Sequence, residues 1–318
     1  MKKLIAIVCA MLMVLSLCAC GSAGKQEKYV VGICQLLTHD ALDAATQGFK
    51  DALVAELGEE NVEFKDQDAG GEYANCATIV DGFVAENVDL ILANATAPLQ
   101  AAASATSDIP VLGTSVTDYA TALNITDWTG TVGGNISGTS DLAPLDQQAD
   151  MIAELFPEAS TVGLLYCSAE PNSVYQVTKM AAYLADLGSA SKEFAFADVN
   201  ELAAVTQSAC DECDVIYIPT DNTAAAYTET IANVVLSAGV PVVAGESGIC
   251  AGCGVATLSI SYYDLGYTTG QMAAKILKGE ADVSEMPVEY APEVTKMYNA
   301  ANCEALGITP PDGYEPIG

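Results

Sequence analysis

The sequence predicts an α/β protein with two lobes, each a doubly wound parallel sheet, joined by a hinge of several strands. Apolar runs rich in Val and Ile alternate with Ala-rich helical stretches, which is typical of parallel sheets covered on both faces. The alternation restarts in the second half of the chain. With 318 residues, of which 51% are hydrophobic, the chain is long enough for two buried cores.

The first 19 residues are predicted to be a lipoprotein signal peptide. Lys2 and Lys3 precede an apolar stretch from Leu4 to Leu17, which is too short to span a membrane. The stretch ends in LCACG, where Cys20 follows the small Ala19 and is the predicted lipid acceptor, with palmitate as an expected acyl chain. Cys18 follows the bulky Leu17 and fits worse, and an ordinary secretory signal is the alternative. Residues 20–28 would then form a lipidated tether.

The predicted elements follow in order along the rest of the chain. Strands are expected at 29–34, 62–66, 88–95, 109–114, 160–166, 191–196, 215–220 and 240–245. Helices are expected at 39–57, 73–86, 98–106, 172–187, 200–210 and 223–238. The Gly-rich segment 128–141 is expected to be either the first crossing between the lobes or a surface loop.

Short polar side chains follow most of these strands. Ligands of doubly wound sheets bind beyond the carboxyl ends of the strands, where the N-termini of helices present unpaired N–H groups. For one such position alone, an ordinary helix N-cap explains the residue as well. For the whole set, a polar cleft between the lobes is favoured, and its predicted ligand-binding residues are Thr38, Thr96, Thr117, Asp118, Ser173, Thr220, Asp221, Asn222 and Glu246.

Several segments together carry a family resemblance. They are THDALDAATQGFKDAL, LILANATAPLQAAA, PNSVYQVTKM, IPTDNT and SYYDLGYTTGQMAAKILKGE. In this order they resemble the substrate-binding proteins of ABC transporters, whose fold is the two-lobed periplasmic-binding fold of type I. The resemblance spans about residues 29–308 and implies a small-molecule ligand, because characterised members bind tryptophan, phenylalanine or tyrosine.

The two-lobed fold implies that the chain crosses the hinge more than once. Lobe one is expected to contain 29–143 and 263–291, and lobe two 144–262 and 292–318.

An amino-acid ligand carries an ammonium and a carboxylate. Asp221 and Glu246 are predicted to face the ammonium from lobe two, with Asp118 as the candidate in lobe one. Hydroxyl groups at Thr38, Thr96, Thr117 and Ser173, with helix N-termini, could hold the carboxylate in a chain that has no arginine. N-caps and solvated loop acids remain the alternative for the carboxylates.

The paired cysteines predict neither a metal site nor a cofactor. Cys210 and Cys213 precede a strand, whereas Cys250 and Cys253 follow one, so strands of six residues at ~3.3 Å each place the pairs ~20 Å apart, too far to share zinc. Cys250 and Cys253 are expected in a loop, where a disulfide is possible in an exported protein.

The formal net charge of −31 excludes nucleic acid as a partner. The chain has one histidine, His39, and lacks a nucleophile elbow or a phosphate-binding loop, so no catalytic residue and no enzyme activity are predicted.

The expected function is that of a lipid-anchored solute-binding protein that delivers an aromatic or hydrophobic amino acid to an ABC permease and its ATPase. A sensing receptor domain of the same fold and, less favoured, a thiol-redox protein using Cys250 and Cys253 are the alternatives.

Overall fold

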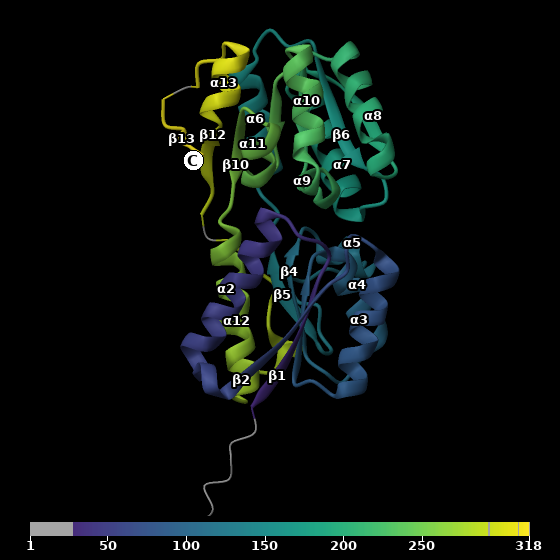
Figure 1. The fold of residues 1–318 in the computed structure, drawn as a ribbon, viewed down its shortest axis with the longest axis vertical. Coiled ribbons are helices and arrows are strands. Elements are labelled where there is room, and N and C mark those ends of the chain that lie inside the picture. The colour runs from purple at the N-terminus through teal and green to yellow at the C-terminus, as the bar shows by residue number, and fades with distance from the viewer. Residues whose placement is uncertain (1–27, 292, 311, 318) are drawn as a thin grey trace, which may run out of the picture.

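The computed structural model describes residues 28–291, 293–310 and 312–317. The signal peptide, Cys20 and all but the last residue of the tether lie outside the described residues. Two α/β lobes stand one above the other (Figure 1), which confirms the predicted fold class. No helix within the described ranges is long and apolar enough to cross a membrane.

The first sheet has the strand order β11-β5-β4-β3-β1-β2. Its strands are β1 Tyr29–Gln35, β2 Val62–Asp68, β3 Leu90–Asn94, β4 Val111–Val116, β5 Ile136–Ser140 and β11 Glu289–Tyr290. All of its strand pairs are parallel. The helices of this lobe are α2 Asp40–Leu57, α3 Tyr73–Glu86, α4 Thr96–Ala105, α5 Tyr119–Leu123 and α12 Tyr262–Leu277, with 3₁₀ turns at Glu59–Asn61 and Val283–Glu285.

The second sheet has the order β13-β12-β10-β9-β8-β6-β7. Its strands are β6 Thr161–Cys167, β7 Ala190–Phe196, β8 Val215–Ile218, β9 Val242–Ala244, β10 Ala256–Ser259, β12 Thr295–Tyr298 and β13 Glu315–Pro316. Among the described strand pairs of this sheet, only β12 and β10 run antiparallel. The helices are α6 Leu145–Leu155, α7 Pro171–Asp186, α8 Val199–Glu212, α9 Asn222–Ala226, α10 Thr228–Ala238, α11 Ser247–Cys253 and α13 Ala300–Leu306.

Each sheet is covered on both faces, so each lobe has two apolar layers. In the first lobe, α2 and α12 bury Phe49 and Met272 on one face, and α3 and α4 bury Val80 and Leu99 on the other. In the second lobe, one layer lies under α6, α7 and α13, and the other under α8, α10 and α11. This double coverage explains why the central strands are apolar throughout rather than alternating.

The chain passes between the sheets after β5, after β10 and between β11 and β12. The lobe boundaries predicted above stay a prediction. The Gly-rich segment 128–141 contains β5, a strand that the sequence analysis did not expect, and the first crossing follows directly after it. The predicted helix 223–238 is divided at Tyr227, which leaves the helical conformation with φ −125° and ψ 32°.

Candidate ligand-binding site

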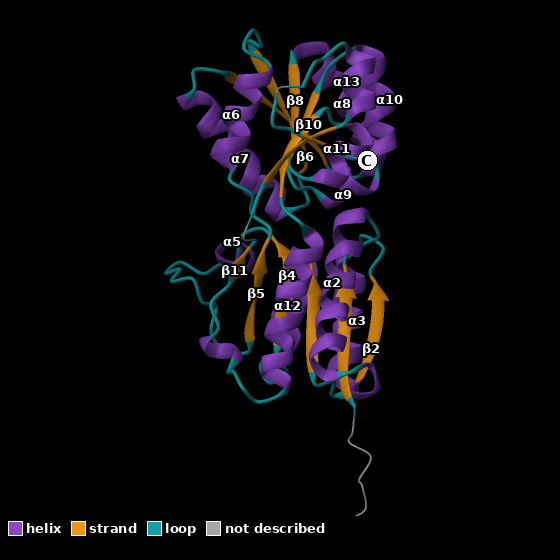
Figure 2. Ribbon diagram, turned by 90° about the vertical axis from the view of Figure 1, so that its left-hand side faces the viewer, coloured by secondary structure: helices purple, strands orange, loops and turns teal. Residues whose placement is uncertain are grey.

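The carboxyl ends of the strands in the first lobe point toward the second lobe (Figure 2). Loops from the strand ends of the two lobes meet directly. Tyr73 donates a hydrogen bond from its hydroxyl to the Ala169 carbonyl oxygen at 2.8 Å, and His39 Nε2 lies 3.2 Å from Asn222 Oδ1. Because these bonds join the lobes, the structure represents a closed arrangement in which polar side chains at the strand ends are buried.

The predicted residues of lobe one lie at or near this junction. Thr96, at the start of α4, and Thr117, just after β4, are buried. Thr38 is exposed and donates a hydrogen bond to Asp68 at 2.8 Å. Asp118 is half-buried and caps α5, since its Oδ1 accepts the Thr121 N–H at 2.7 Å.

The predicted residues of lobe two form one connected group. Ser173 in α7 is fully buried, and the Thr220 carbonyl accepts hydrogen bonds from the side chains of Asn172 and Gln176, each at 3.1 Å. Asp221 is buried at the N-cap of α9, where Oδ1 accepts the Ala224 N–H at 2.8 Å and Oδ2 accepts the Cys167 N–H at 2.7 Å.

Glu246 is the third predicted acid, and it caps α11. Its two carboxylate oxygens accept the N–H groups of Gly248 and Ile249. Thus Asp118, Asp221 and Glu246 each perform the N-cap role that the sequence left open as the alternative. Whether any of them also contacts a ligand ammonium stays a prediction.

Burial changes the proton affinity of the two acids in lobe two. It raises the pKa of Asp221, to which the neighbouring charge of Glu170 adds, and it raises the pKa of Glu246 to about 7. Neither acid has a lysine among its hydrogen-bond or ion-pair partners in the described ranges. A cation entering the junction would therefore meet buried carboxylates that backbone N–H groups stabilise but that no lysine neutralises.

Sequence reasoning missed Glu170, the acid that organises this side of the junction. It is 3% exposed, and its carboxylate accepts hydrogen bonds from the backbone N–H groups and the side chains of both Asn222 and Thr223, at 2.7 to 3.0 Å. Glu170 thereby positions Asn222 for its contact with His39. The sequence could have indicated Glu170, because it lies in the segment CSAEPNS directly after the predicted strand 160–166.

A second acid that the sequence analysis missed is Asp141, directly after β5. It is 4% exposed, and its Oδ2 accepts the hydroxyl of Tyr262 at 2.9 Å. Polar residues directly after strands were predicted to bind the ligand. Asp141 would have been among them if β5 had been recognised within the Gly-rich segment.

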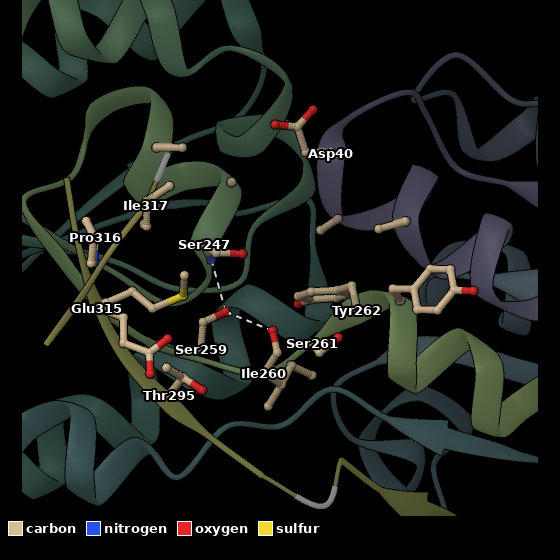
Figure 3. A pocket seen from close by; sticks show the side chains of 16 residues that line it. Asp40, Ser247, Ser259, Ile260, Ser261, Tyr262, Thr295, Glu315, Pro316 and Ile317 are labelled. Carbon is tan, nitrogen blue, oxygen red and sulfur yellow. Dashed lines mark hydrogen bonds between the residues drawn. The ribbon is translucent and has the colours of Figure 1, made fainter. Parts of the chain in front are cut away.

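Among the described residues, several cavities lie along the junction of the lobes, and two of them involve the start of α2. The larger, of about 520 Å³, lies between the start of α2, the start of α11, the crossing into α12 and the C-terminal strands (Figure 3). In it, Ser259 Oγ accepts the Ser247 N–H at 3.1 Å and donates to the Ile260 carbonyl. The second, of about 410 Å³, is lined by Thr38, His39 and Asp40 of lobe one and by residues of α9, α10 and α11 of lobe two.

His39 contacts a side chain of the opposite lobe. Its ring is half-buried, Nε2 contacts Asn222, and Nδ1 is buried without a partner among the described residues. Burial lowers the pKa of His39, although Asn222 and the nearby acids Glu170, Asp43 and Asp40 act in the opposite direction.

We expect ligand affinity to fall on acidification because of His39. In open lobes the ring is in water, with an ordinary pKa of ~6.5, and the closed state lowers that value, so protonation favours opening. The contribution of His39 to affinity is complete above that ordinary pKa and is lost, by at most about tenfold per pH unit, as the pH falls below it. Calorimetric titrations between pH 5 and pH 8, an interval of roughly the histidine range, measure the effect.

His39→Gln is the matched variant, since glutamine keeps a hydrogen-bond donor but does not titrate in this range. The buried acids are present in both proteins, so the difference between the two pH profiles reports His39 together with its coupling to the nearby acids. Superimposable profiles would contradict the prediction.

The cysteines expected in a loop lie in a helix, which corrects that expectation. Cys250 and Cys253 belong to α11, which exists because Glu246 caps its first N–H groups. Both thiols are buried and free in the structure, and Cys253 Sγ donates to the Ile249 carbonyl at 3.4 Å. Their disulfide stays a prediction.

Comparisons with known proteins agree with this architecture. Residues 30–314 match the family model described as ABC transporter substrate binding protein. A tyrosine-binding protein of Clostridioides difficile (strain R20291) is 32% identical over 284 residues, which cover 89% of this chain and 81% of that protein.

Two solved structures show similarity in fold over almost the whole chain. An ABC domain in complex with L-Trp, from Streptococcus pneumonia, has 31% identity and a TM-score of 0.87, covering 92% of this chain and 100% of that one. The ligand-free, open structure of a substrate-binding protein with adhesive properties, from Clostridium difficile, has 34% identity and a TM-score of 0.70, covering 91% and 99%. At almost equal identity, this structure is thus more similar to the ligand-bound protein.

Proposed function

Because the chain belongs to the ABC transporter substrate-binding protein family, whose members bind rather than transform their substrates, we propose that it binds an aromatic amino acid between its lobes and delivers it to a permease. Substrate-binding proteins of this family are extracytoplasmic. The proposed partners are therefore a small-molecule ligand and the membrane components of an ABC importer.

One observation carries the choice of ligand. Two proteins that share more than 30% identity with this chain over about nine-tenths of its length are described with aromatic amino acids, tyrosine in one case and tryptophan in the other. The closed arrangement supports the proposal, because hydrogen bonds from His39 and Tyr73 already join the lobes around buried polar side chains. The Arg-free composition leaves hydroxyl and N–H groups to hold the ligand carboxylate.

A thermal-shift panel tests this proposal. Tryptophan, tyrosine and phenylalanine are compared with leucine, glutamate and a set of nucleosides at equal concentration. A ligand present at about 100 times its Kd stabilises the folded state by roughly 2.7 kcal/mol, which raises the melting temperature measurably. We expect at least one aromatic amino acid to do so. A panel in which only non-aromatic compounds shift the melting temperature would contradict the proposal.

We further propose that Cys20 carries a lipid anchor, since Ala19 precedes it and a short apolar segment lies before both. Cys20→Ala is expected to abolish metabolic labelling with palmitate and to release the protein from the membrane fraction. Cys18→Ala is the matched control and should remain labelled and membrane-bound. Persistent labelling of Cys20→Ala would place the anchor elsewhere.

A further inference from the structure

Asp141 lies where the chain first crosses between the lobes. β5 ends at Ser140, and the Asp141 N–H donates to the Val116 carbonyl at 3.3 Å, so the residue prolongs the edge of the first sheet that faces lobe two. Tyr262 belongs to another crossing, because it begins α12 directly after the chain leaves β10. The hydrogen bond from Tyr262 to Asp141 Oδ2 therefore joins two segments of the hinge.

The second oxygen of this carboxylate is unused. Asp141 Oδ1 is buried and accepts no hydrogen bond of regular geometry among the described residues, although the Thr117 hydroxyl lies close enough to the carboxyl to oppose the rise in its pKa that burial causes. Unlike Asp221 and Glu246, each of which accepts backbone N–H groups with both oxygens, Asp141 leaves one oxygen open. A buried acceptor without a partner is costly and needs an explanation, and at the junction of the lobes a donor group of the ligand supplies one.

No cation of the described chain offsets the charge of Asp141. The five ion pairs that the described lysines form all lie on partly exposed surfaces and engage other acids, and the sequence contains no arginine. Burial raises the pKa of Asp141, and the charge of Asp141 in turn contributes to the raised pKa of Glu246. Two buried acids thus share one region that lacks a positive charge, which is the electrostatic complement of an ammonium group.

A second unpartnered acceptor lies on the neighbouring strand. Ser115 Oγ is buried without a partner among the described residues, and Ser115 adopts a left-handed conformation with φ 54°. It sits where the register between β4 and β5 shifts, between Gly113 and Val116, one residue before the carbonyl that receives the Asp141 N–H. Ser115 Oγ and Asp141 Oδ1 therefore lie at the ends of two adjacent strands, β4 and β5, on the edge of the sheet that faces lobe two.

We propose that Asp141 accepts the α-ammonium group of the amino-acid ligand, that Tyr262 positions its carboxylate, and that Ser115 Oγ is a second acceptor for the same group. An ammonium has three N–H donors, and Asp141 Oδ1 and Ser115 Oγ engage two of them. The inference rests on the proposed function, since it requires an amino acid as ligand. It places the ammonium at the hinge, whereas the sequence analysis placed it at Asp221, Glu246 or Asp118.

A pair of ligands that differ only in the amino group tests the assignment. L-Tyrosine is compared with 3-(4-hydroxyphenyl)propionate, and L-tryptophan with indole-3-propionate, by calorimetric titration of the full mature chain. Breaking a buried, hydrogen-bonded charge pair typically weakens binding by ~30-fold to several thousand-fold. We expect the wild type to prefer the amino acid to its desamino analogue by at least that lower factor.

Asp141→Asn is expected to lose this preference. Its affinity for the amino acid should fall by at least ~30-fold, while its affinity for the desamino analogue changes by less than about threefold. Tyr262→Phe keeps the carboxylate but removes the hydrogen bond that orients it, and should weaken amino-acid binding by about tenfold. Asp198→Asn, a matched change at the exposed N-cap of α8, should leave both affinities as in the wild type.

The outcomes separate the two proposals. A wild type that binds none of these compounds contradicts the proposed function and this inference together. A wild type that discriminates, with Asp141→Asn discriminating equally well, overturns the inference alone. Loss of discrimination in Asp221→Asn or Glu246→Gln but not in Asp141→Asn returns the ammonium to the acids predicted from the sequence. If Asp141→Asn does not fold, Tyr262→Phe decides, because unchanged discrimination in that variant overturns the inference that Asp141, held by Tyr262, accepts the ammonium.

Discussion

Gly266→Val is expected to destabilise the first lobe severely. Gly266 lies in α12 where it crosses α2, and a Cβ atom there would overlap the backbone oxygen of Ala45. Gly48 of α2 faces the backbone of Tyr263 in the same way, and a Cβ at Gly270 would lie 2.5 Å from the Phe49 oxygen. Both partners in these contacts are helix backbone, so side-chain rotation cannot relieve the overlap.

We expect the loss of unfolding free energy to exceed ~3 kcal/mol, a large part of the total of about 5–15 kcal/mol that a protein usually has. Urea unfolding followed by circular dichroism measures it. Gly82→Ala in α3 is the matched control, since nothing lies within 4 Å of a Cβ there, and it should raise stability by about 0.5–1 kcal/mol. A Gly266→Val protein with a melting temperature close to that of the wild type would contradict the close packing of α2 on α12.

Glu170→Gln is expected to destabilise the second lobe although the side chain keeps its size. Asn222 and Thr223 surround the carboxylate with N–H and O–H donors, and the amide that replaces one oxygen would turn its own N–H groups toward such donors. Leaving a buried donor unsatisfied costs ~1–3 kcal/mol. Because at least two donors lose their acceptor, we expect roughly 2–5 kcal/mol of lost unfolding free energy.

Denaturant unfolding of the ligand-free protein checks this value. Glu201→Gln is the control, because Glu201 accepts a single exposed N–H bond, from Ala197 at 2.9 Å, and its variant should stay within about 0.5 kcal/mol of the wild type. If both variants unfold at the same denaturant concentration as the wild type, Glu170 does not organise the loop that carries Asn222.

The fold was predictable because most elements follow one rule, alternation of buried strands with Ala-rich helices. The exceptions are elements that show neither an apolar run nor an Ala-rich helical pattern. β5 lies in a segment with Gly133, Gly134 and Gly138, and Ile136 is the one apolar residue of the strand, so no apolar run marks it. The short α11 contains two glycines and two cysteines, and its formation depends on the cap that Glu246 provides.

The candidate site was predictable in location but not in the role of each acid. A carboxylate directly after a parallel strand can cap the next helix or face a ligand, and both roles place it at the same point of the chain. Only the contacts distinguish them. Asp221 has both oxygens occupied by backbone N–H groups, whereas Asp141 retains an open oxygen. His39, expected to be uninvolved in catalysis, proves to contact Asn222 of the other lobe across more than 180 residues of chain.

Small-angle scattering of the free and ligand-saturated protein tests most directly whether an aromatic amino acid is held between two closing lobes. The ligand is the aromatic compound that raises the melting temperature most, and leucine at the same concentration serves as the control. The radius of gyration is expected to decrease on saturation with the aromatic amino acid, because the ligand stabilises the state in which His39 and Tyr73 bridge the lobes. Equal radii in the free and saturated states, at a concentration where calorimetry demonstrates full binding, would contradict the account.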